Sequence, residues 1–129
     1  MTKHSVIRAN VIRAFTGLQK VFPFSEYMND KSKKYFELAK LIDQRGYSSG
    51  STILSIGSGP CDFEAILSKL GYKVTAIDDL KDQWHLLGQN RQRIKDFAEQ
   101  NGVDLKVASA ETPRFGGACF DVVMLLDVD

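Results

Sequence analysis

The sequence has few residues that could build a disulfide framework, a metal site or a membrane anchor. It contains two cysteines and two histidines. The two cysteines, Cys61 and Cys119, are too few for a disulfide framework, which predicts reduced thiols in a cytoplasmic protein. The histidines, His4 and His85, have no partner at metal-ligand spacing, so both are interpreted as surface or packing residues. No apolar run approaches the length that spans a membrane, and the N-terminus lacks a hydrophobic signal region.

The net charge of +1 conceals an uneven distribution along the chain. Residues 1–50 contain 9 Lys/Arg against 4 Asp/Glu, whereas residues 51–129 contain 8 against 12. A basic segment could meet an anionic substrate, nucleic acid or a lipid surface. Its basic residues are spread along amphipathic helices, however, which is typical of an ordinary solvated face. We therefore expect neither a nucleic-acid partner nor membrane insertion.

Two helices are predicted in residues 1–50. Apolar residues at helical spacing predict the first helix over 4–20, and Pro23 interrupts the pattern. The pair Asn29-Asp30 then offers a cap for a second helix. Its predicted apolar side consists of Tyr35, Phe36, Leu38, Leu41 and Ile42. Residues 1–50 are interpreted as a helical lid segment that covers a ligand site of the remaining chain.

From residue 51 onward, predicted strands alternate with predicted helices. The strands are expected over 52–56, 73–77, 105–109 and 120–126, and the helices over 62–70 and 82–100. Gly71 ends the first of these helices, where the chain can enter the left-handed conformation without steric cost. The alternation predicts an α/β fold, a doubly wound and mostly parallel sheet covered on both faces and preceded by two helices. Residues 51–129 are interpreted as the N-terminal half of this domain.

The segment 120–126 is almost wholly apolar, which is typical of a strand that is covered on both faces. The sequence ends three residues later. This predicts either a longer protein that is truncated after the fourth strand, or a second chain that covers this edge in a homo-oligomer. Truncation is favoured, because a bare edge of this kind invites aggregation.

Residues 51–64 carry the strongest functional signal. A short apolar run leads into Gly57-Ser58-Gly59, a helix follows, and the next apolar run ends in Asp78-Asp79, 21 residues after Gly57. This is the layout of a β-α-β unit that holds an adenosine-type cofactor. The glycines let the backbone approach the ligand, and the acid binds ribose hydroxyls.

The same segment argues against a phosphate-bearing cofactor. A dinucleotide motif requires a third glycine where this chain has Asp62. A pyrophosphate would lie at the helix N-terminus, where Asp62 and Glu64 would repel it. No Gly-Lys-Ser/Thr follows the glycines, so a Walker loop is absent as well.

Together these segments resemble the class I S-adenosylmethionine-dependent methyltransferases, a Rossmann-like family. The resemblance starts with residues 53–63 and continues through 107–113 and 120–128. It implies S-adenosylmethionine as the cofactor, with the glycine turn against its methionine and ribose and Asp78 on the ribose hydroxyls. The other positions that it implies for the cofactor are Ser55 at the methionine end, Asp79 or Leu80 beside the adenine, Ser109 and Ala110 at the adenine edge, and Asp127 facing the substrate cleft.

Three positions depart from the pattern of this family. The family usually has an acid at Ser55, a third glycine at Cys61 and another acid at Ser109. Serine still forms hydrogen bonds but loses the charge-assisted contribution, which is worth about 1 kcal/mol more than a neutral bond. Cofactor binding is therefore expected to be weaker than usual.

The resemblance implies transfer of a methyl group to an oxygen, nitrogen or carbon nucleophile. The fourth strand lacks the Asn/Asp-Pro-Pro-aromatic signature of enzymes that methylate nucleic-acid bases, which favours a small-molecule, lipid or sugar acceptor. Asp127 is the candidate for a general base. Two alternatives stay open: an NAD(P)-dependent oxidoreductase and a non-catalytic, methyltransferase-like scaffold. Trp84 is interpreted as a core residue and Tyr27 as a structural one, with cofactor contact as the second interpretation of each.

Overall fold

The computed structural model describes residues 3–108 and 120–125. The helices are α1 (Lys3–Gln19), α2 (Ser25–Met28), α3 (Ser32–Gln44), α4 (Asp62–Lys69), α5 (Gln83–Leu86) and α6 (Asn90–Gln100). The strands are β1 (Thr52–Ile56), β2 (Lys73–Asp78), β3 (Val103–Val107) and β4 (Val122–Leu125). None of the described helices is long and apolar enough to cross a membrane.

The four strands form one sheet in the order β3-β2-β1-β4, and every pair is parallel. In β1, Ile53 lies opposite Val74 of β2 on one side and Val122 of β4 on the other. The strand order therefore steps outward from β1 to β3 and then returns to the other side of β1. Ligands of open α/β sheets bind at such a reversal, beyond the carboxyl ends of the strands. This confirms the predicted Rossmann-like α/β fold with preceding helices.

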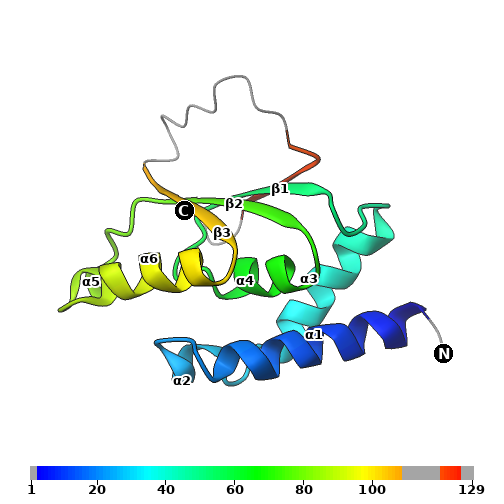
Figure 1. Cartoon of the computed structure of the whole chain (residues 1–129), viewed down its shortest axis with the longest axis horizontal. Coiled ribbons are helices and arrows are strands. Elements are labelled where there is room, and N and C mark those ends of the chain that lie inside the picture. Colours follow the sequence, from blue (N-terminus) through cyan, green and yellow to red (C-terminus); the bar gives the residue numbers. More distant parts are fainter. Residues whose placement is uncertain (1–2, 109–119, 126–129) are drawn as a thin grey trace.

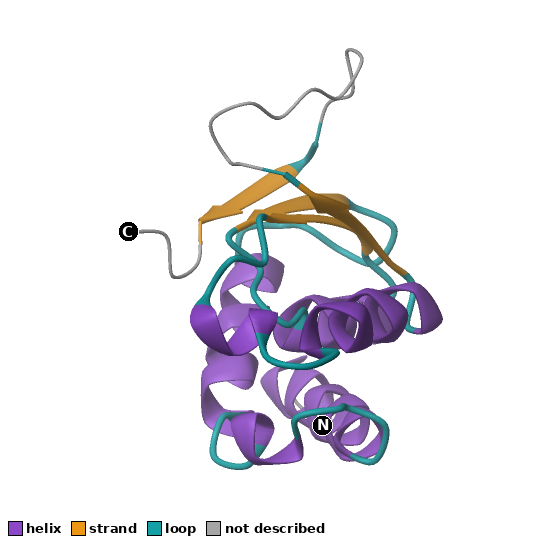
Figure 2. Cartoon of the chain, turned by 90° about the vertical axis from the view of Figure 1, so that its left-hand side faces the viewer, coloured by secondary structure: helices purple, strands orange, loops and turns teal. Residues whose placement is uncertain are grey.

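The described helices all lie on one side of the sheet. Figures 1 and 2, which view the molecule from perpendicular directions, show the sheet above a layer that contains α4, α5 and α6, with α1 and α2 farthest from the strands. Right-handed crossovers that step in one direction all fall on the same face, and β1, β2 and β3 step in one direction. The sequence predicted helices on both faces of the sheet. Within residues 3–108 and 120–125, helices cover one face only.

The N-terminal helices share one hydrophobic core with the sheet. This core contains Val11 and Leu18 of α1, Tyr35 and Ile42 of α3, and the fully buried Ile66 of α4. The strands add Ile53, Val74, Ala76, Val103 and Met124, whose side chains point toward the helices. Three apolar residues of the helical patterns in α1 and α3 do not join this core: Val6, Ile12 and Leu41 are 42%, 50% and 46% exposed.

Strand β4 is an edge of the described sheet. Met124 faces the core and is 9% exposed, whereas Val123 and Leu125 on the opposite face are 57% and 67% exposed. The apolar sequence predicted covering on both faces, and the described residues supply it on one face only. Asp121, just before β4, ties the strand to β1, because its carboxylate accepts the Thr52 N–H at 2.9 Å.

Three local predictions were wrong. The pair Asn29-Asp30 does not cap the second long helix, because residues 25–28 form the short helix α2 and α3 begins only after Lys31. Helix α3 has no side-chain cap. The Asn29 side chain instead accepts a hydrogen bond from the Gln19 amide at 2.8 Å. The predicted helix 82–100 is divided into α5 and α6, with Gly88 between them at φ +53°. Strand β3 begins two residues earlier than predicted, directly after Gly102 at φ +78°.

Substitution of two glycines, Gly17 and Gly71, tests the backbone conformation and the space around each residue. A methyl group added at Gly17, inside α1, would meet nothing within 4 Å, whereas one at Gly71 would lie 2.1 Å from the Ser49 hydroxyl, on a backbone at φ +100°. Gly17→Ala should raise the free energy of unfolding by about 0.5–1 kcal/mol, because alanine loses less backbone entropy in a helix. Gly71→Ala should lower it by more than about 1 kcal/mol. Urea unfolding of the two variants measures both changes, and equal effects would contradict the described backbone.

Candidate functional site

The glycine turn follows β1 and is held by the end of β2. The Gly57 N–H donates to the Ile77 carbonyl at 2.8 Å, and the Ser58 N–H shares this acceptor at 3.3 Å. Gly57 and Gly59 have φ of +78° and +59°, a region in which a side chain is unfavourable. A side chain at Gly59 would project into open space. The predicted turn is therefore present, with its backbone open to a ligand at the carboxyl ends of the strands.

The Asp78 carboxylate joins the two β-α connections. Its Oδ2 atom accepts the Gly59 N–H at 2.7 Å, and its Oδ1 atom accepts the Leu80 N–H at 2.7 Å. Each carboxylate oxygen can accept two hydrogen bonds, so Asp78 keeps acceptor capacity for a ligand. Asp79 differs, because its side chain is exposed and accepts the Lys81 N–H at 3.1 Å.

Cys61 occupies the position where the resembled family has a third glycine. Its backbone is left-handed, with φ +65°, and it directly precedes α4. Glycine adopts this conformation without strain, which explains the family preference in physical terms. The free Cys61 thiol is fully buried, and this burial raises its pKa well above the ordinary value.

A buried acid from α4 reaches the serine that replaces the usual acid at the end of β1. The Ser55 hydroxyl donates to Glu64 Oε2 at 2.5 Å, and both residues are buried. Burial, together with the neighbouring Asp62 carboxylate, raises the pKa of Glu64 to about 8. Glu64 therefore places a carboxyl group beside Ser55, near the carboxyl end of β1.

A second buried acid is paired with a tyrosine of the N-terminal helices. The Tyr35 hydroxyl donates to Asp62 Oδ2. Burial raises the pKa of both groups, and the Asp62 charge raises that of Tyr35 further. The Tyr35 ring also stacks on Phe63, with 5.8 Å between ring centroids and 8° between planes. Helix α3 is therefore fixed to the start of α4 by one polar contact and one aromatic contact.

These groups surround a cavity of about 100 Å³ beside the glycine turn. Four carboxylates contribute to its lining, from Asp62, Glu64, Asp78 and Asp82. The remaining lining residues are Tyr27, Lys34, Tyr35, Leu38, Gly57, Ser58, Gly59, Pro60, Phe63, Trp84 and His85. Four of these come from residues 1–50, so the N-terminal helices form one wall of the cavity. The boundary between a lid and a cofactor domain at residue 50 stays a prediction.

The short helix α5 closes the cavity with aromatic side chains. Trp84 is half-buried, so the interpretation of this residue as core was wrong. Its ring packs edge-on against Phe24 at 5.1 Å and stacks on Tyr27 at 5.7 Å. The Lys31 ammonium lies 3.1 Å from the centroid of the Tyr27 ring. His85, predicted to be a surface or packing residue, is 1% exposed and lines the cavity.

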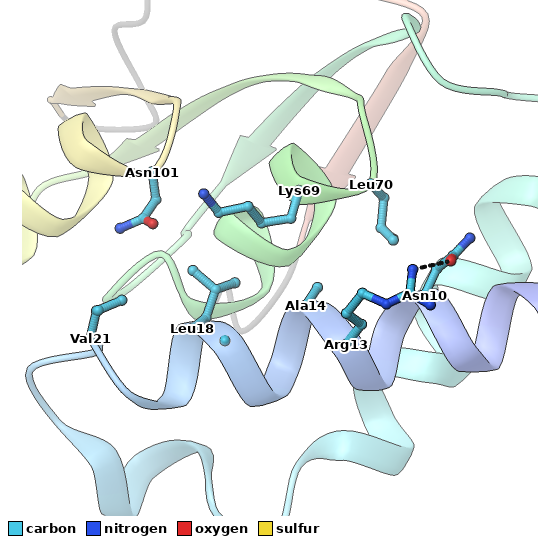
Figure 3. A pocket seen from close by; sticks show the side chains of 9 residues that line it. Asn10, Arg13, Ala14, Leu18, Val21, Lys69, Leu70 and Asn101 are labelled. Carbon is cyan, nitrogen blue, oxygen red and sulfur yellow. Dashed lines mark hydrogen bonds between the residues drawn. The ribbon is translucent and has the colours of Figure 1, made fainter.

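A larger groove of about 630 Å³ lies far from this turn. Figure 3 shows it between α1 and the C-terminal ends of α4 and α6, with Lys69 and Asn101 above the helix that carries Arg13. Arg13 donates to the Asn10 side chain at 3.4 Å, an interaction within one exposed helix face. Exposed basic side chains of this kind do not form a built site, so the smaller cavity at the glycine turn remains the candidate.

The structure brings together most of the predicted cofactor residues that it describes. Gly57, Ser58, Gly59 and Asp78 line the cavity, and Ser55 lies behind it in contact with Glu64. Asp79 is exposed and is not among the lining residues. The predicted residues Ser109, Ala110 and Asp127 lie outside the described residues.

The sequence interpretation missed the contributions of Glu64, Tyr35 and His85 to the site. Glu64 was interpreted only as a charge that repels phosphate. Its place two residues after Asp62 in the first turn of α4 gave no indication that both side chains would be buried. Tyr35 fitted the apolar side of its helix, and that pattern concealed the use of its hydroxyl.

Comparison with known proteins shows similarity at the level of the fold. No family model matches the chain, and no curated protein matches it. A mutant of the nicotianamine synthase MtNAS, crystallised in complex with S-adenosylmethionine, matches 95% of this chain at 21% identity and a TM-score of 0.55. A second structure of a mutant of MtNAS matches 95% of the chain at 19% identity and a TM-score of 0.54. The chain spans about half the length of these synthase chains, 50% and 49%.

The raised pKa of Glu64 predicts how stability changes with pH. The folded-state pKa of about 8 lies above the ordinary 4.5, so the folded protein holds more protons than the unfolded chain between these values. The free energy of unfolding should therefore fall as pH rises from about 4.5 to about 8. Glu64→Gln removes this contribution of the Glu64 side chain and still accepts the Ser55 hydroxyl. The free energy of unfolding of the Glu64→Gln protein should exceed that of the wild type by about 1–3 kcal/mol at pH 8 and should differ little from it at pH 5.

The measurement is urea unfolding of both proteins at pH 5, 6, 7 and 8. Glu37→Gln is the matched control, because the Glu37 side chain is 52% exposed and forms an i,i+3 ion pair with Lys40 at 3.5 Å. Loss of an exposed ion pair has little effect on stability. A pH dependence that is unchanged in Glu64→Gln would show that the Glu64 carboxyl titrates normally.

Proposed function

We propose that the protein binds S-adenosylmethionine at the Gly57–Gly59 turn and transfers its methyl group to a small-molecule, lipid or sugar-type acceptor. The fold supports a nucleoside site at this edge of the sheet. The motif order along the chain favours methyl transfer. The MtNAS structure with bound S-adenosylmethionine supports the choice of cofactor.

The observation that carries this proposal is the charge of the cavity. Four carboxyl groups line it, whereas Lys34 and His85 are the basic side chains among the described lining residues. S-adenosylmethionine bears a sulfonium and an ammonium group and no phosphate. Carboxylates attract such cations and repel a pyrophosphate, and a bound cation favours the ionised form of Glu64, whose pKa burial raises to about 8. The cavity therefore favours the sulfonium nucleoside over NAD(P).

The described residues fit the parts of this cofactor. The free acceptor capacity of Asp78 suits the ribose hydroxyls, and the Gly57–Gly59 backbone leaves room for the sugar and the methionine chain. The cofactor ammonium would be held by Glu64, with Ser55 behind it. Asp62 is already paired with Tyr35, so its main contribution is negative charge near the sulfonium.

When bound, S-adenosylmethionine supplies a methyl group on an activated leaving group. The protein's part is then to align the acceptor with the methyl carbon and to exclude water. The wall formed by Tyr27, Tyr35 and Trp84 suits the second task, because it covers the glycine turn with aromatic surface. Asp127 stays the proposed general base, and an acceptor with a weakly acidic proton would require one.

Asp78→Asn tests the cofactor assignment. Asparagine has one side-chain acceptor oxygen instead of two, so it cannot hold both backbone N–H groups and the ribose. We expect affinity for S-adenosylmethionine and S-adenosylhomocysteine to fall at least tenfold, since charge-assisted hydrogen bonds contribute about 1.5–3 kcal/mol. Calorimetric titration measures this change. Asp96→Asn is the control, because Asp96 is exposed on α6 and bonded only to Gln92 at 2.9 Å.

The same titration includes NAD, and an activity assay separates the remaining alternatives. Binding of NAD without a response to either sulfur nucleoside would establish the oxidoreductase instead. No binding of any of the three would favour the scaffold. In the assay, S-adenosylhomocysteine is the product of methyl transfer, whereas methylthioadenosine would show that the amino-acid chain is transferred. The second product matters because the similar structures are of a synthase.

A further inference from the structure

His85 is a buried polar side chain that nothing in the described chain satisfies. It lies in α5 and is 1% exposed. Its backbone N–H donates to the Asp82 carbonyl at 2.9 Å. Neither ring nitrogen, Nδ1 or Nε2, has a hydrogen-bond partner among the described residues. The imidazole nevertheless lines the cavity beside the glycine turn.

An unsatisfied imidazole is a costly choice for a packing position. A neutral imidazole has one N–H donor and one nitrogen acceptor, and both lose their water when the ring is buried. Each unpaired group costs about 1–3 kcal/mol, which a phenylalanine or leucine would avoid. Buried polar groups in folded proteins are almost always hydrogen-bonded. The missing partner of His85 therefore points to a molecule that enters the cavity.

The surroundings of His85 hold its ring in place without satisfying it. The Trp84 ring lies 4.1 Å from the His85 ring, centroid to centroid, and inclined by 63°. Trp84 is itself fixed by Phe24 and Tyr27 from the N-terminal helices. The Asn90 amide donates to the Trp84 carbonyl at 2.8 Å, which ties α5 to the start of α6. The imidazole is thus oriented before any ligand binds, as a binding residue should be.

Carboxyl groups outnumber the basic side chains, Lys34 and His85, in the lining of the cavity. The Asp62, Glu64, Asp78 and Asp82 carboxylates accept hydrogen bonds when ionised, and the Tyr35 hydroxyl already donates to Asp62. A ribose hydroxyl both donates and accepts. The Asp78 carboxylate can accept a hydrogen bond from this hydroxyl but cannot donate one to its oxygen. An imidazole N–H in the same cavity provides the complementary donor.

We infer that His85 binds the ribose hydroxyls of the nucleoside together with Asp78, the carboxylate accepting and the imidazole donating. This inference rests on the proposed function and makes it more specific, because it assigns a second sugar-binding residue that no motif contains. It also gives α5 a role: the short helix carries the imidazole to the cavity and the indole that orients it.

The test compares ribose and deoxyribose ligands on paired variants. Calorimetry measures the binding of adenosine, 2′-deoxyadenosine, 3′-deoxyadenosine and S-adenosylhomocysteine to the wild type and to His85→Phe and His85→Gln. Wild-type protein should prefer adenosine over at least one deoxy ligand by about tenfold. His85→Phe should bind adenosine about tenfold more weakly, and its preference for ribose should shrink to the part that Asp78 provides. His85→Gln, which keeps a donor, should restore part of it.

Two controls separate binding from folding. Leu86→Ala changes the next residue of α5, whose side chain is 53% exposed and is not among the cavity-lining residues, and it should bind like the wild type. His85→Phe removes an unsatisfied group from the empty cavity, so its unfolding temperature should match or exceed that of the wild type. A purely structural role for the imidazole would lower this temperature and leave the ribose preference intact.

A spectroscopic measurement does not depend on any substitution at His85. The chain contains two histidines, so a His4→Gln protein shows ring nitrogen signals from His85 alone. Adenosine should shift these signals, and the deoxy ligand that lacks the contacted hydroxyl should shift them less. Equal shifts, or a ribose preference that is undiminished in His85→Phe, would overturn the inference while the proposed function stands. Failure of the wild type to bind either sulfur nucleoside or adenosine would instead overturn the proposed function, and this inference with it.

Discussion

The Asp78 carboxylate is the constraint on which the site depends. It accepts the Gly59 N–H with one oxygen and the Leu80 N–H with the other, each at 2.7 Å. These bonds fix the two connections that follow β1 and β2, at the edge where the strand order reverses. Leu80, with φ +53°, is held in a left-handed conformation that a leucine rarely adopts. The interaction both closes the backbone of the turn and leaves acceptor capacity at the cavity, so one residue serves both the fold and the candidate site.

Around this constraint, the chain keeps carboxylates in positions where they are costly. Glu64 and Asp62 are buried in the first turn of α4, and each has a neutral hydroxyl as its close partner, from Ser55 and Tyr35. A hydroxyl compensates a buried charge only in part, which is why burial dominates the raised pKa of both acids. A helix N-terminus favours negative charge and offsets some of the cost. The carboxyl group that lies beside Ser55 at the end of β1 is thus supplied by α4.

The periodicity of the sequence was sufficient for the fold and for part of the site. The strands β1 and β2 and the helix α4 were predicted within a residue or two, because apolar runs bounded by Gly57 and Gly71 define them. The glycine turn and Asp78 were found because the spacing of 21 residues between Gly57 and Asp78 is typical of a β-α-β unit. Among the residues of the candidate site, the predictions that failed concern tertiary contacts. Trp84 and Tyr35 fit helical apolar patterns. Such a pattern predicts that a side chain is buried, but it does not predict which residues its indole or hydroxyl group contacts. Glu64 and His85 look like ordinary surface residues in sequence, and only the packing of other segments buries them.

The break at Gly88 shows why the polar groups of the site escaped prediction. A continuous helix over 82–100 would run along the sheet, and Trp84 would then lie in the core as its spacing suggests. With Gly88 at φ +53°, α5 is separated from α6 and its indole packs against Phe24 and Tyr27 instead. That contact joins α5 to the N-terminal segment that contains Phe24 and Tyr27, about sixty residues away in sequence. The wall of the cavity therefore exists only once both parts of the chain are folded together. A binding site assembled in this way is specified by the tertiary structure, and a local motif can predict only the half of it that the glycine turn contains.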